Sequence, residues 1–239
     1  MSIGPNASKA PSLAPLGEDM LLVSFGNVID AACNARVMAL AARIKADPFP
    51  GFVECVPAYA SLAVVFDIRL VADRHPERAP MDTVHAWVSS LAERPMHEQA
   101  SQNPIKRIPV CYDGPDLGSL AAFHRLDPDE VVHIHSSTTY RVFMMGFIPG
   151  FAYMGSVDER IATPRLSSPR KAVPAGSVGI AGMQTGIYPL TSPGGWQLIG
   201  RTPLRLFRTD GDPSFYLQPG DAVEFFSISE SEFANWHVG

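Results

Sequence analysis

The sequence predicts an α+β protein in which a ferredoxin-like domain of βαββαβ order precedes a β-barrel. Two observations lead to this prediction. In the first half, apolar runs of strand length alternate with two stretches whose apolar residues recur at helical spacing. In the second half, short apolar runs are separated by turns of Gly and Pro, a pattern typical of a closed or nearly closed barrel. We therefore expect a disordered tail over 1–17, the α+β domain over 18–112, a helical connector over 113–139 and the barrel over 140–239.

The strands and helices of the first domain follow from local patterns. Strands are expected at Met20–Gly26, Phe52–Val56, Leu62–Asp67 and in the segment "IKRIPVCYD". Apolar residues at helical spacing mark two helices, the first at Cys33, Val37, Leu40 and Ile44 and the second at Met81, Val84, Val88 and Leu91. The first helix should end before Asp47-Pro48, because the residue before a proline avoids the α region. Pro80 suits the first turn of the second helix.

The segment between the two domains carries the signals of two short helices. One helical face is marked by Leu117, Leu120, Ala121 and His124. The next helix has Asp127 as its expected N-cap, Pro128 at the first helical position and Glu130 two residues later, which is a capping-box pattern. We expect these two helices to connect the domains.

Charge is unevenly distributed along the chain. The formal net charge is −5, which argues against a general nucleic-acid binder. The segment from Gly146 to Pro203 nevertheless carries +3, which leaves −8 for the rest of the chain. A basic island in an acidic protein suggests a small anionic ligand or an acidic partner. The alternative is that its arginines pair with acidic residues elsewhere in the fold.

No targeting or membrane segment is expected. No run approaches the roughly 18 apolar residues that a membrane-spanning helix needs. The first residues, "MSIGPNASKAPSLAPLG", contain no apolar core of a signal peptide. We therefore expect a cytoplasmic protein.

The same basic segment is rich in rigid turns. It holds ten Gly and seven Pro in 58 residues, and proline turns lower the entropy cost of presenting side chains in one geometry. In "TPRLSSPR", a proline precedes each of Arg165 and Arg170, and a guanidinium fixed in this way is suited to gripping a carboxylate or phosphate. In "SPGGW", a glycine turn presents Trp196, whose ring could stack on a ligand or pack in the core.

Several common chemistries have no motif in the chain. There are four lysines and no G-x-x-x-x-G-K-[ST], which excludes a phosphate-binding P-loop. No metal site is expected, because the three cysteines lie far apart and the two histidines of "HIH" diverge on a helix. The second of them, His135, is a candidate general base or substrate ligand, with a hydrogen-bonded structural histidine as the alternative.

Four long motifs give the chain a resemblance to a known family. The segments "GFIPGFAYMG", "ATPRLSSPRKAVPAGSVGIAG", "TGIYPLTSPGGWQLIGRTPLRLF" and "LQPGDAVEFF" resemble the KipI family, whose members are also called the B subunit of 5-oxoprolinase (PxpB) or allophanate hydrolase subunit 1. The likeness runs from about Gly17 to Ile228. The departures are Met154 where Leu is usual, Lys171-Ala172 where pairs like Thr-Arg are usual, and a longer N-terminal tail.

The resemblance implies a fold, a reaction and partners. The fold is a ferredoxin-like domain followed by a cyclophilin-like β-barrel. The reaction is the ATP-dependent opening of 5-oxo-L-proline to L-glutamate by a complex that also contains a paralogous KipA-like component and a LamB/YcsF-like component. The implied cofactor is ATP, with Mg²⁺ where the nucleotide needs it, at a site on a partner or shared with one. An ATP site that is incomplete in this chain agrees with the missing P-loop.

The resemblance also singles out site residues, whose roles are inferred from their chemistry. As catalytic residues, His135 moves a proton while Arg165 and Arg170 hold a carboxylate or a phosphorylated intermediate. The expected substrate-binding positions are Tyr140, Gln184, Tyr188, Trp196 and Arg201.

Two other functions stay open beside this one. Fused chains of biotin-dependent urea carboxylases resemble the same motifs, so the chain could be half of such a carboxyltransferase. The KipI name refers to an inhibitor of a sensor histidine kinase, a non-enzymatic role in which the same surface meets a kinase. The chain has no biotinylation motif, but this decides little because a partner could carry it.

Overall fold

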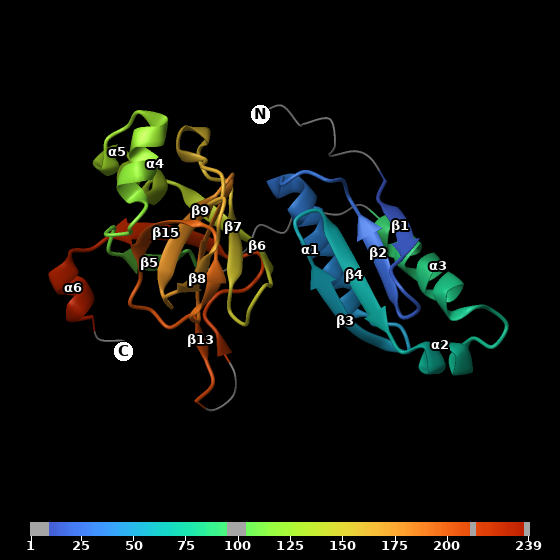
Figure 1. The fold of residues 1–239 in the computed structure, drawn as a ribbon. Helices are drawn as coiled ribbons and strands as arrows, with labels where there is room; N and C mark the ends of the chain where they lie inside the picture. Colours follow the sequence, from blue (N-terminus) through green and yellow to red (C-terminus); the bar gives the residue numbers. More distant parts are fainter. Residues whose placement is uncertain (1–9, 95–103, 211–213, 237–239) are drawn as a thin grey trace. The chain divides into compact units, whose positions relative to one another are not determined.

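The chain folds into two units, 1–100 and 101–239, which are described separately (Figure 1). The computed structural model describes residues 10–94, 104–210 and 214–236. Helices and sheets occur in both units, which confirms the predicted α+β class. Within these described ranges, no helix combines the length and the apolar character that crossing a membrane requires.

The first unit is a four-stranded antiparallel sheet with helices packed on it. In chain order its elements are β1 (Ser12–Pro15), β2 (Met20–Ser24), α1 (Ala31–Ala46), β3 (Phe52–Pro57), β4 (Ser61–Phe66), α2 (Ile68–Arg74) and α3 (Pro80–Ala92). The strand order in the sheet is β1-β2-β4-β3. Alternate residues of β2 and β4 are buried, as expected of strands that turn one face to a core. The helices supply the other half of that core with residues at helical spacing, namely Val37, Leu40, Ile44, Val84, Val88 and Leu91.

The edge strand of this sheet differs from the prediction. The segment 12–15, expected to lie in a disordered tail, forms β1 and pairs with β2 in the register Ser12↔Ser24. The strand expected at the other end of the βαββαβ order, 106–110, belongs instead to the second unit. The first unit therefore takes its fourth strand from before the βαββα sequence rather than from after it. Residues 1–9 of the predicted tail lie outside the described residues.

The second unit contains the barrel. In chain order its elements are β5 (Lys106–Val110), α4 (Leu117–His124), α5 (Pro128–Ser136), β6 (Thr139–Met145), β7 (Ala152–Gly155), η1 (Glu159–Ile161), β8 (Arg170–Val173), β9 (Ser177–Ala181), β10 (Gln184–Ile187), β11 (Ser192–Gly194), β12 (Gln197–Arg201), β13 (Phe207–Arg208), β14 (Ser214–Phe215), β15 (Ala222–Ser227) and α6 (Glu230–Ala234). Seven strands form one sheet in the order β12-β9-β10-β7-β6-β15-β5. Two small sheets, β11-β8 and β13-β14, accompany it.

The seven-stranded sheet curls until its two edges meet. At one edge β5 runs parallel to β15, in the register Lys106↔Val223. Directly after β5, Cys111 forms an antiparallel bridge with Arg201 at the end of β12, with N···O distances of 2.8 and 2.9 Å. This bridge joins the first and last strands of the sheet order. The barrel predicted from the Gly- and Pro-rich pattern is thereby confirmed as a nearly closed sheet.

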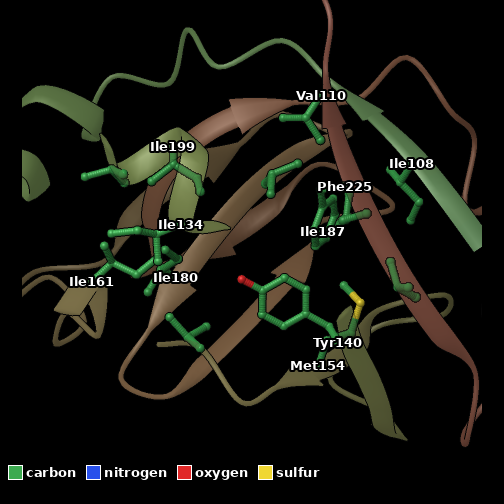
Figure 2. Packing of buried hydrophobic residues seen from close by; sticks show 14 of the residues in the cluster. Ile108, Val110, Ile134, Tyr140, Met154, Ile161, Ile180, Ile187, Ile199 and Phe225 are labelled. Carbon is green, nitrogen blue, oxygen red and sulfur yellow. The ribbon is translucent and has the colours of Figure 1, made fainter. Parts of the chain in front are cut away.

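The inside of the barrel is a packed apolar core. Figure 2 shows Tyr140 beside Met154 in this core, with Ile187 near Phe225 and with Ile108 and Val110 on β5. Leu120 of α4 and Ile134 of α5 belong to the same core cluster. The two helices predicted at 113–139 therefore form as expected, capping box included, but they pack on the barrel instead of connecting two domains.

Candidate ligand pocket

An open cavity of about 270 Å³ lies in the second unit, formed by loops and short strands from four parts of the sequence. Its lining residues are Phe147, Phe151, Tyr153, Arg165, Pro169, Tyr188, Pro193, Gly194, Gly195 and Trp196. Three of the predicted site residues, Arg165, Tyr188 and Trp196, thus meet at one place. They come from "TPRLSSPR", "GIYPL" and "SPGGW", which are separated along the chain but belong to the same Gly- and Pro-rich segment.

The floor of the cavity is a cluster of aromatic rings. The ring of Phe151 lies 5.3 Å from those of Trp196 and Tyr188, with interplanar angles of 88° and 78°. Tyr153 adds a ring 5.8 Å from Trp196. The contacts of Phe151 are edge-to-face, the arrangement that aromatic quadrupoles favour, and Phe151, Tyr188 and Trp196 are almost fully buried. The rings therefore form a rigid wall.

Two glycines allow this close packing of rings. A Cβ built on Gly186 of β10 would lie 3.0 Å from Trp196 and 3.1 Å from Phe151. A Cβ on Gly194 of β11 would lie 2.7 Å from ring atoms of Tyr188. Because Cβ atoms seldom or never approach so closely, the rings can occupy these places only where side chains are missing.

Phe147 forms an exposed part of the wall in a strained conformation. Its φ is 69°, in the left-handed region that a bulky residue rarely adopts, and its side chain is 59% exposed. The backbone is held there by hydrogen bonds from Gly146 N to Phe151 O and from Phe151 N to Ile148 O. Strain that the surrounding structure maintains is commonly found at ligand sites.

Arg165 is the charged group at this cavity. Its guanidinium lies 5.9 Å from the centroid of the Trp196 ring, and the residue is exposed. In the described part of the chain no carboxylate forms an ion pair with Arg165, whereas Arg170 and Arg201 each have one. Its five N–H donors are therefore available to an anion bound above the rings.

The charge of Arg165 affects the pKa values of the two phenols of the cavity, Tyr153 and Tyr188. Burial raises the pKa of Tyr188, and a hydrogen bond from the backbone of Trp196 and then the charge of Arg165 act in the opposite direction. Burial likewise raises the pKa of Tyr153, again with Arg165 opposing. Both phenols are neutral at physiological pH, so the arginine gives the cavity a net positive character.

Arg170 and Arg201, the other two predicted arginines, are committed to carboxylates of the segment "DGPD". Arg170 Nη2 lies 2.6 Å from Asp116 Oδ1, and the other oxygen of Asp116 accepts a hydrogen bond from Leu198 N at 2.6 Å. Arg201 pairs with Asp113 through Nε at 2.8 Å. These arginines fasten the segment to the barrel and do not line the cavity, so their catalytic and substrate-binding roles stay predictions.

His135 belongs to the core and not to the cavity. It is fully buried, its Nδ1 lies 2.8 Å from the hydroxyl of Tyr112, and its Nε2 lies 2.9 Å from Oγ1 of Thr185. Since the Thr185 hydroxyl donates to Gly179 O, Nε2 must carry the hydrogen and Nδ1 must accept from Tyr112. Burial lowers the pKa of His135 to about 3. In this structure His135 is a neutral, hydrogen-bonded core residue, and its proton-transfer role stays a prediction.

Two predicted substrate-binding residues also lie away from the cavity. Tyr140 is 1% exposed, and its hydroxyl donates to the carbonyl of His135 at 3.1 Å. Gln184 is at the start of β10, at the other end of that strand from Tyr188. The cavity residues Phe147, Phe151 and Tyr153 were not singled out from the sequence, although "GFIPGFAYMG" contains all three. Their clustering in a segment otherwise made of turns is the signal that could have found them.

No group of three or more His, Cys, Asp or Glu side chains within 10–94, 104–210 and 214–236 is arranged to hold a metal ion. The donors that the cavity offers are a guanidinium, phenols and an indole, which suit an organic anion rather than a cation.

Comparisons with known proteins agree with this architecture. The family model described as carboxyltransferase domain, subdomain C and D, matches residues 11–217. The B subunit of the Bacillus subtilis 5-oxoprolinase is 45% identical over 91% of this chain and 93% of its own length. The crystallised protein TTHA0988 is similar to 88% of this chain with a TM-score of 0.76 and 34% identity, and this chain spans 40% of it. The Kluyveromyces lactis urea amidolyase, 21% identical with a TM-score of 0.72, shares the fold over 98% of this chain and 16% of its own.

Proposed function

The chain belongs to the carboxyltransferase-domain family, subdomains C and D, and within it to the proteins that form the B subunit of 5-oxoprolinases, and on this premise we propose that it serves an ATP-dependent 5-oxoprolinase. The complex opens 5-oxo-L-proline to L-glutamate while ATP is hydrolysed to ADP and phosphate. In this proposal the aromatic cavity of the second unit binds 5-oxoproline. The observation that carries it is the combination of a ring-lined cavity with one arginine that no carboxylate of the described residues neutralises.

The shape and charge of 5-oxoproline match the cavity. The molecule is a small, nearly flat lactam ring that bears one carboxylate. The carboxylate pairs with the guanidinium of Arg165 through two parallel hydrogen bonds, while Trp196 and Tyr188 contact the ring. The cavity volume of about 270 Å³ lies just below the usual range of ligand pockets, roughly 300–1,000 Å³, as expected for so small a ligand. The rigid aromatic wall holds the ligand in one orientation and keeps water from one of its faces.

The remaining chemistry comes from partner proteins in this proposal. The chain lacks a P-loop, and its histidine candidate is buried away from the cavity. ATP, bound with Mg²⁺ on the partners or at a site shared with them, would supply the phosphoryl group that activates the lactam. The LamB/YcsF-like and KipA-like components complete the site. That this fold occupies only 40% of the TTHA0988 chain supports its use as one part of a larger unit.

The test compares Arg165 with a neighbouring arginine in the reconstituted complex. Arg165→Ala should raise the KM for 5-oxoproline about ten- to hundredfold, since a charge-assisted bidentate contact is worth roughly 1.5–3 kcal/mol. Arg160→Ala is the control, because Arg160 is an exposed arginine that already pairs with Asp158 at 2.8 Å. The ligand analogue 2-pyrrolidinone, which lacks the carboxylate, should inhibit the wild type and the Arg165→Ala variant equally. An unchanged KM in Arg165→Ala contradicts the proposed binding mode.

A second experiment tests the dependence on partners. The purified chain alone should neither hydrolyse ATP nor release glutamate from 5-oxoproline, and addition of the KipA-like and LamB/YcsF-like components should restore both activities. Turnover by the isolated chain contradicts the division of labour. Two results contradict the proposed function. One is a complete complex that turns over urea with a biotinylated partner but does not turn over 5-oxoproline. The other is a chain whose one measurable effect is to inhibit a sensor kinase.

A further inference from the structure

A second hollow in the same unit is lined by cationic and aromatic side chains. It has a volume of about 350 Å³, and its lining residues are Lys106, Arg205, Arg208, Ser214, Phe215 and Tyr216. None of these residues lines the aromatic cavity. Half of the lining residues are cations, in a chain whose formal net charge is −5. We refer to this hollow as the cationic groove.

Lys106 is fixed in the cationic groove by a buried acid. Its ammonium lies 2.9 Å from Oδ2 of Asp221, a residue that is 1% exposed, and it also donates to the carbonyl oxygen of Tyr216. The same ammonium lies 5.3 Å from the centroid of the Tyr216 ring. An ammonium has three donors, so these two acceptors leave one N–H for a ligand. Because the lysine is already held in place, a ligand loses little affinity to the ordering of its side chain.

The two arginines are more exposed and more weakly paired. Arg208 approaches Asp210 at 3.6 Å, with both side chains more than half exposed, and such a surface pair contributes little. A backbone hydrogen bond, the hydrogen bond and charge of Arg208 and, least of all, the charge of Arg205 lower the pKa of Asp210. Within the described residues, no ion pair at 4.0 Å or less involves Arg205. Among the described residues, the three cations of the groove therefore outnumber the two acids paired with them, Asp210 and Asp221.

We propose that the cationic groove binds the polyphosphate group of a small ligand. Two guanidinium groups and one ammonium around a common hollow exceed what a single carboxylate needs, but they match the several negative oxygens of a di- or triphosphate. The hydroxyl of Ser214 adds a donor, and the exposed rings of Phe215 and Tyr216 offer an apolar flank. This inference goes beyond the proposed function, because it gives the chain a second ligand site that does not depend on 5-oxoproline.

Calorimetry on the full chain tests the proposal with sodium tripolyphosphate and with ATP as probes. At low ionic strength both should bind, and binding should weaken as salt is added, since exposed charges are screened. Arg205→Ala and Arg208→Ala should each weaken tripolyphosphate binding about tenfold. Arg107→Ala is the control: Arg107 neighbours Lys106 on β5 but lies over the ring of Phe226 at 5.1 Å and does not line the groove. Tighter binding of ATP than of tripolyphosphate assigns part of the recognition to the aromatic flank, and equal binding assigns it to the phosphates; both agree with the proposal.

Three outcomes would overturn the proposal that the cationic groove binds polyphosphate. The proposal is wrong if tripolyphosphate does not bind at low ionic strength, or if Arg107→Ala weakens binding as much as the groove variants do. It is also wrong if Arg165→Ala abolishes binding while Arg205→Ala and Arg208→Ala leave it unchanged, because the anion then occupies the aromatic cavity. These outcomes are independent of 5-oxoproline turnover, so a failure here leaves the proposed function standing, and the reverse also holds.

Discussion

Arg165 and Arg170 stand five residues apart after matching prolines, yet their surroundings give them different tasks. Arg165 is exposed beside the Trp196 ring with no carboxylate paired to it in the described residues, whereas Arg170 Nη2 lies 2.6 Å from Asp116. Arg165→Ala should therefore change the melting temperature by at most about 2 °C, as expected for a surface substitution. Arg170→Ala should lower the free energy of unfolding by about 1–3 kcal/mol, because it leaves the partly buried Asp116 without its cation. Thermal unfolding of both variants checks this.

A lysine substitution at Arg170 separates two contributions to stability, the positive charge and the hydrogen-bond geometry of the guanidinium. Arg170→Lys keeps the charge but not the planar fork that also reaches Trp196 O at 3.3 Å, so its stability should lie between those of the wild type and Arg170→Ala. Equal melting temperatures for Arg165→Ala and Arg170→Ala would show that the pair with Asp116 contributes nothing.

His135 predicts a pH dependence of stability. Burial lowers its pKa to about 3, against about 6.5 in an unfolded chain, so between these values the unfolded state binds a proton that the native state does not. The stability that comes from keeping the ring neutral is fully present above about pH 6.5 and is lost as the pH falls toward 3. The loss from this one group is at most about 1.4 kcal/mol per pH unit.

Urea unfolding at pH 7, 6 and 5 measures this slope, with His135→Gln as the comparison. The variant should be less stable at pH 7, because Gln cannot restore both hydrogen bonds of the ring, but it should lose less stability per pH unit below about 6.5. Parallel slopes for the two proteins would show that the histidine is not the group that titrates.

Site residues were predictable where their role depends on local sequence. The prolines before Arg165 and the glycines before Trp196 are visible in "TPR" and "SPGGW", and both side chains line the cavity. His135 could not be placed in the same way, because its burial results from Tyr112 and Thr185, which lie far from it along the chain. Long-range pairing likewise decides the role of Arg201, whose partner Asp113 lies in the "DGPD" segment.

At the scale of elements, the short strand β11 sets the position of a cavity wall. Gly194→Ala should destabilise the chain by about 1–3 kcal/mol and raise the KM for 5-oxoproline, because the new methyl group would lie 2.7 Å from ring atoms of Tyr188. Tyr188 is 1% exposed and its ring contacts Phe151 and Trp196, so a shift of the ring would disturb the aromatic wall. Gly195→Ala is a matched control for stability, since a Cβ there would lie 3.7 Å from its nearest neighbours, an ordinary contact distance. Thermal unfolding of both variants and complex kinetics of Gly194→Ala test this; equal melting temperatures of the two variants would show that Tyr188 adapts freely.

Elements with strong patterns were predictable, and those with weak patterns were not. The spacing of apolar residues in α1 and α3 locates both helices, and α1 ends before Pro48 as the local rule requires. The strand β1 was not predicted, because "SLAP" places a single side chain, Leu13, against the core and so shows no alternating pattern. The helix α2 was not predicted, because it has seven residues of which one is buried, too few for a helical pattern. For β5 the strand is evident, but an apolar run does not say which sheet it joins.

At the scale of the whole molecule, the strand β5 decides where the boundary between the two units lies. A fragment of residues 101–239 retains β5 and should unfold cooperatively, because every strand of the barrel is present. A fragment of residues 113–239, which begins where the sequence alone would place the end of the first domain, lacks β5 and the bridge from Cys111 to Arg201. Its sheet has an open edge at β15 and should aggregate or stay partly unfolded. Circular dichroism and gel filtration of the two fragments test this; equal stability would show that β5 is dispensable.

Closure of the barrel by β5 also dictates an order of events during translation. The first unit completes its sheet from strands that leave the ribosome early, all before residue 67. In contrast, β5 is synthesised first in its own unit and finds its ladder partner in β15, at Ala222–Ser227, close to the end of the chain. At about 5–20 residues per second, the nascent strand waits for seconds with both edges unpaired. The growing polypeptide thus carries a completed first sheet ahead of a strand whose ladder partner is made only near the end of synthesis.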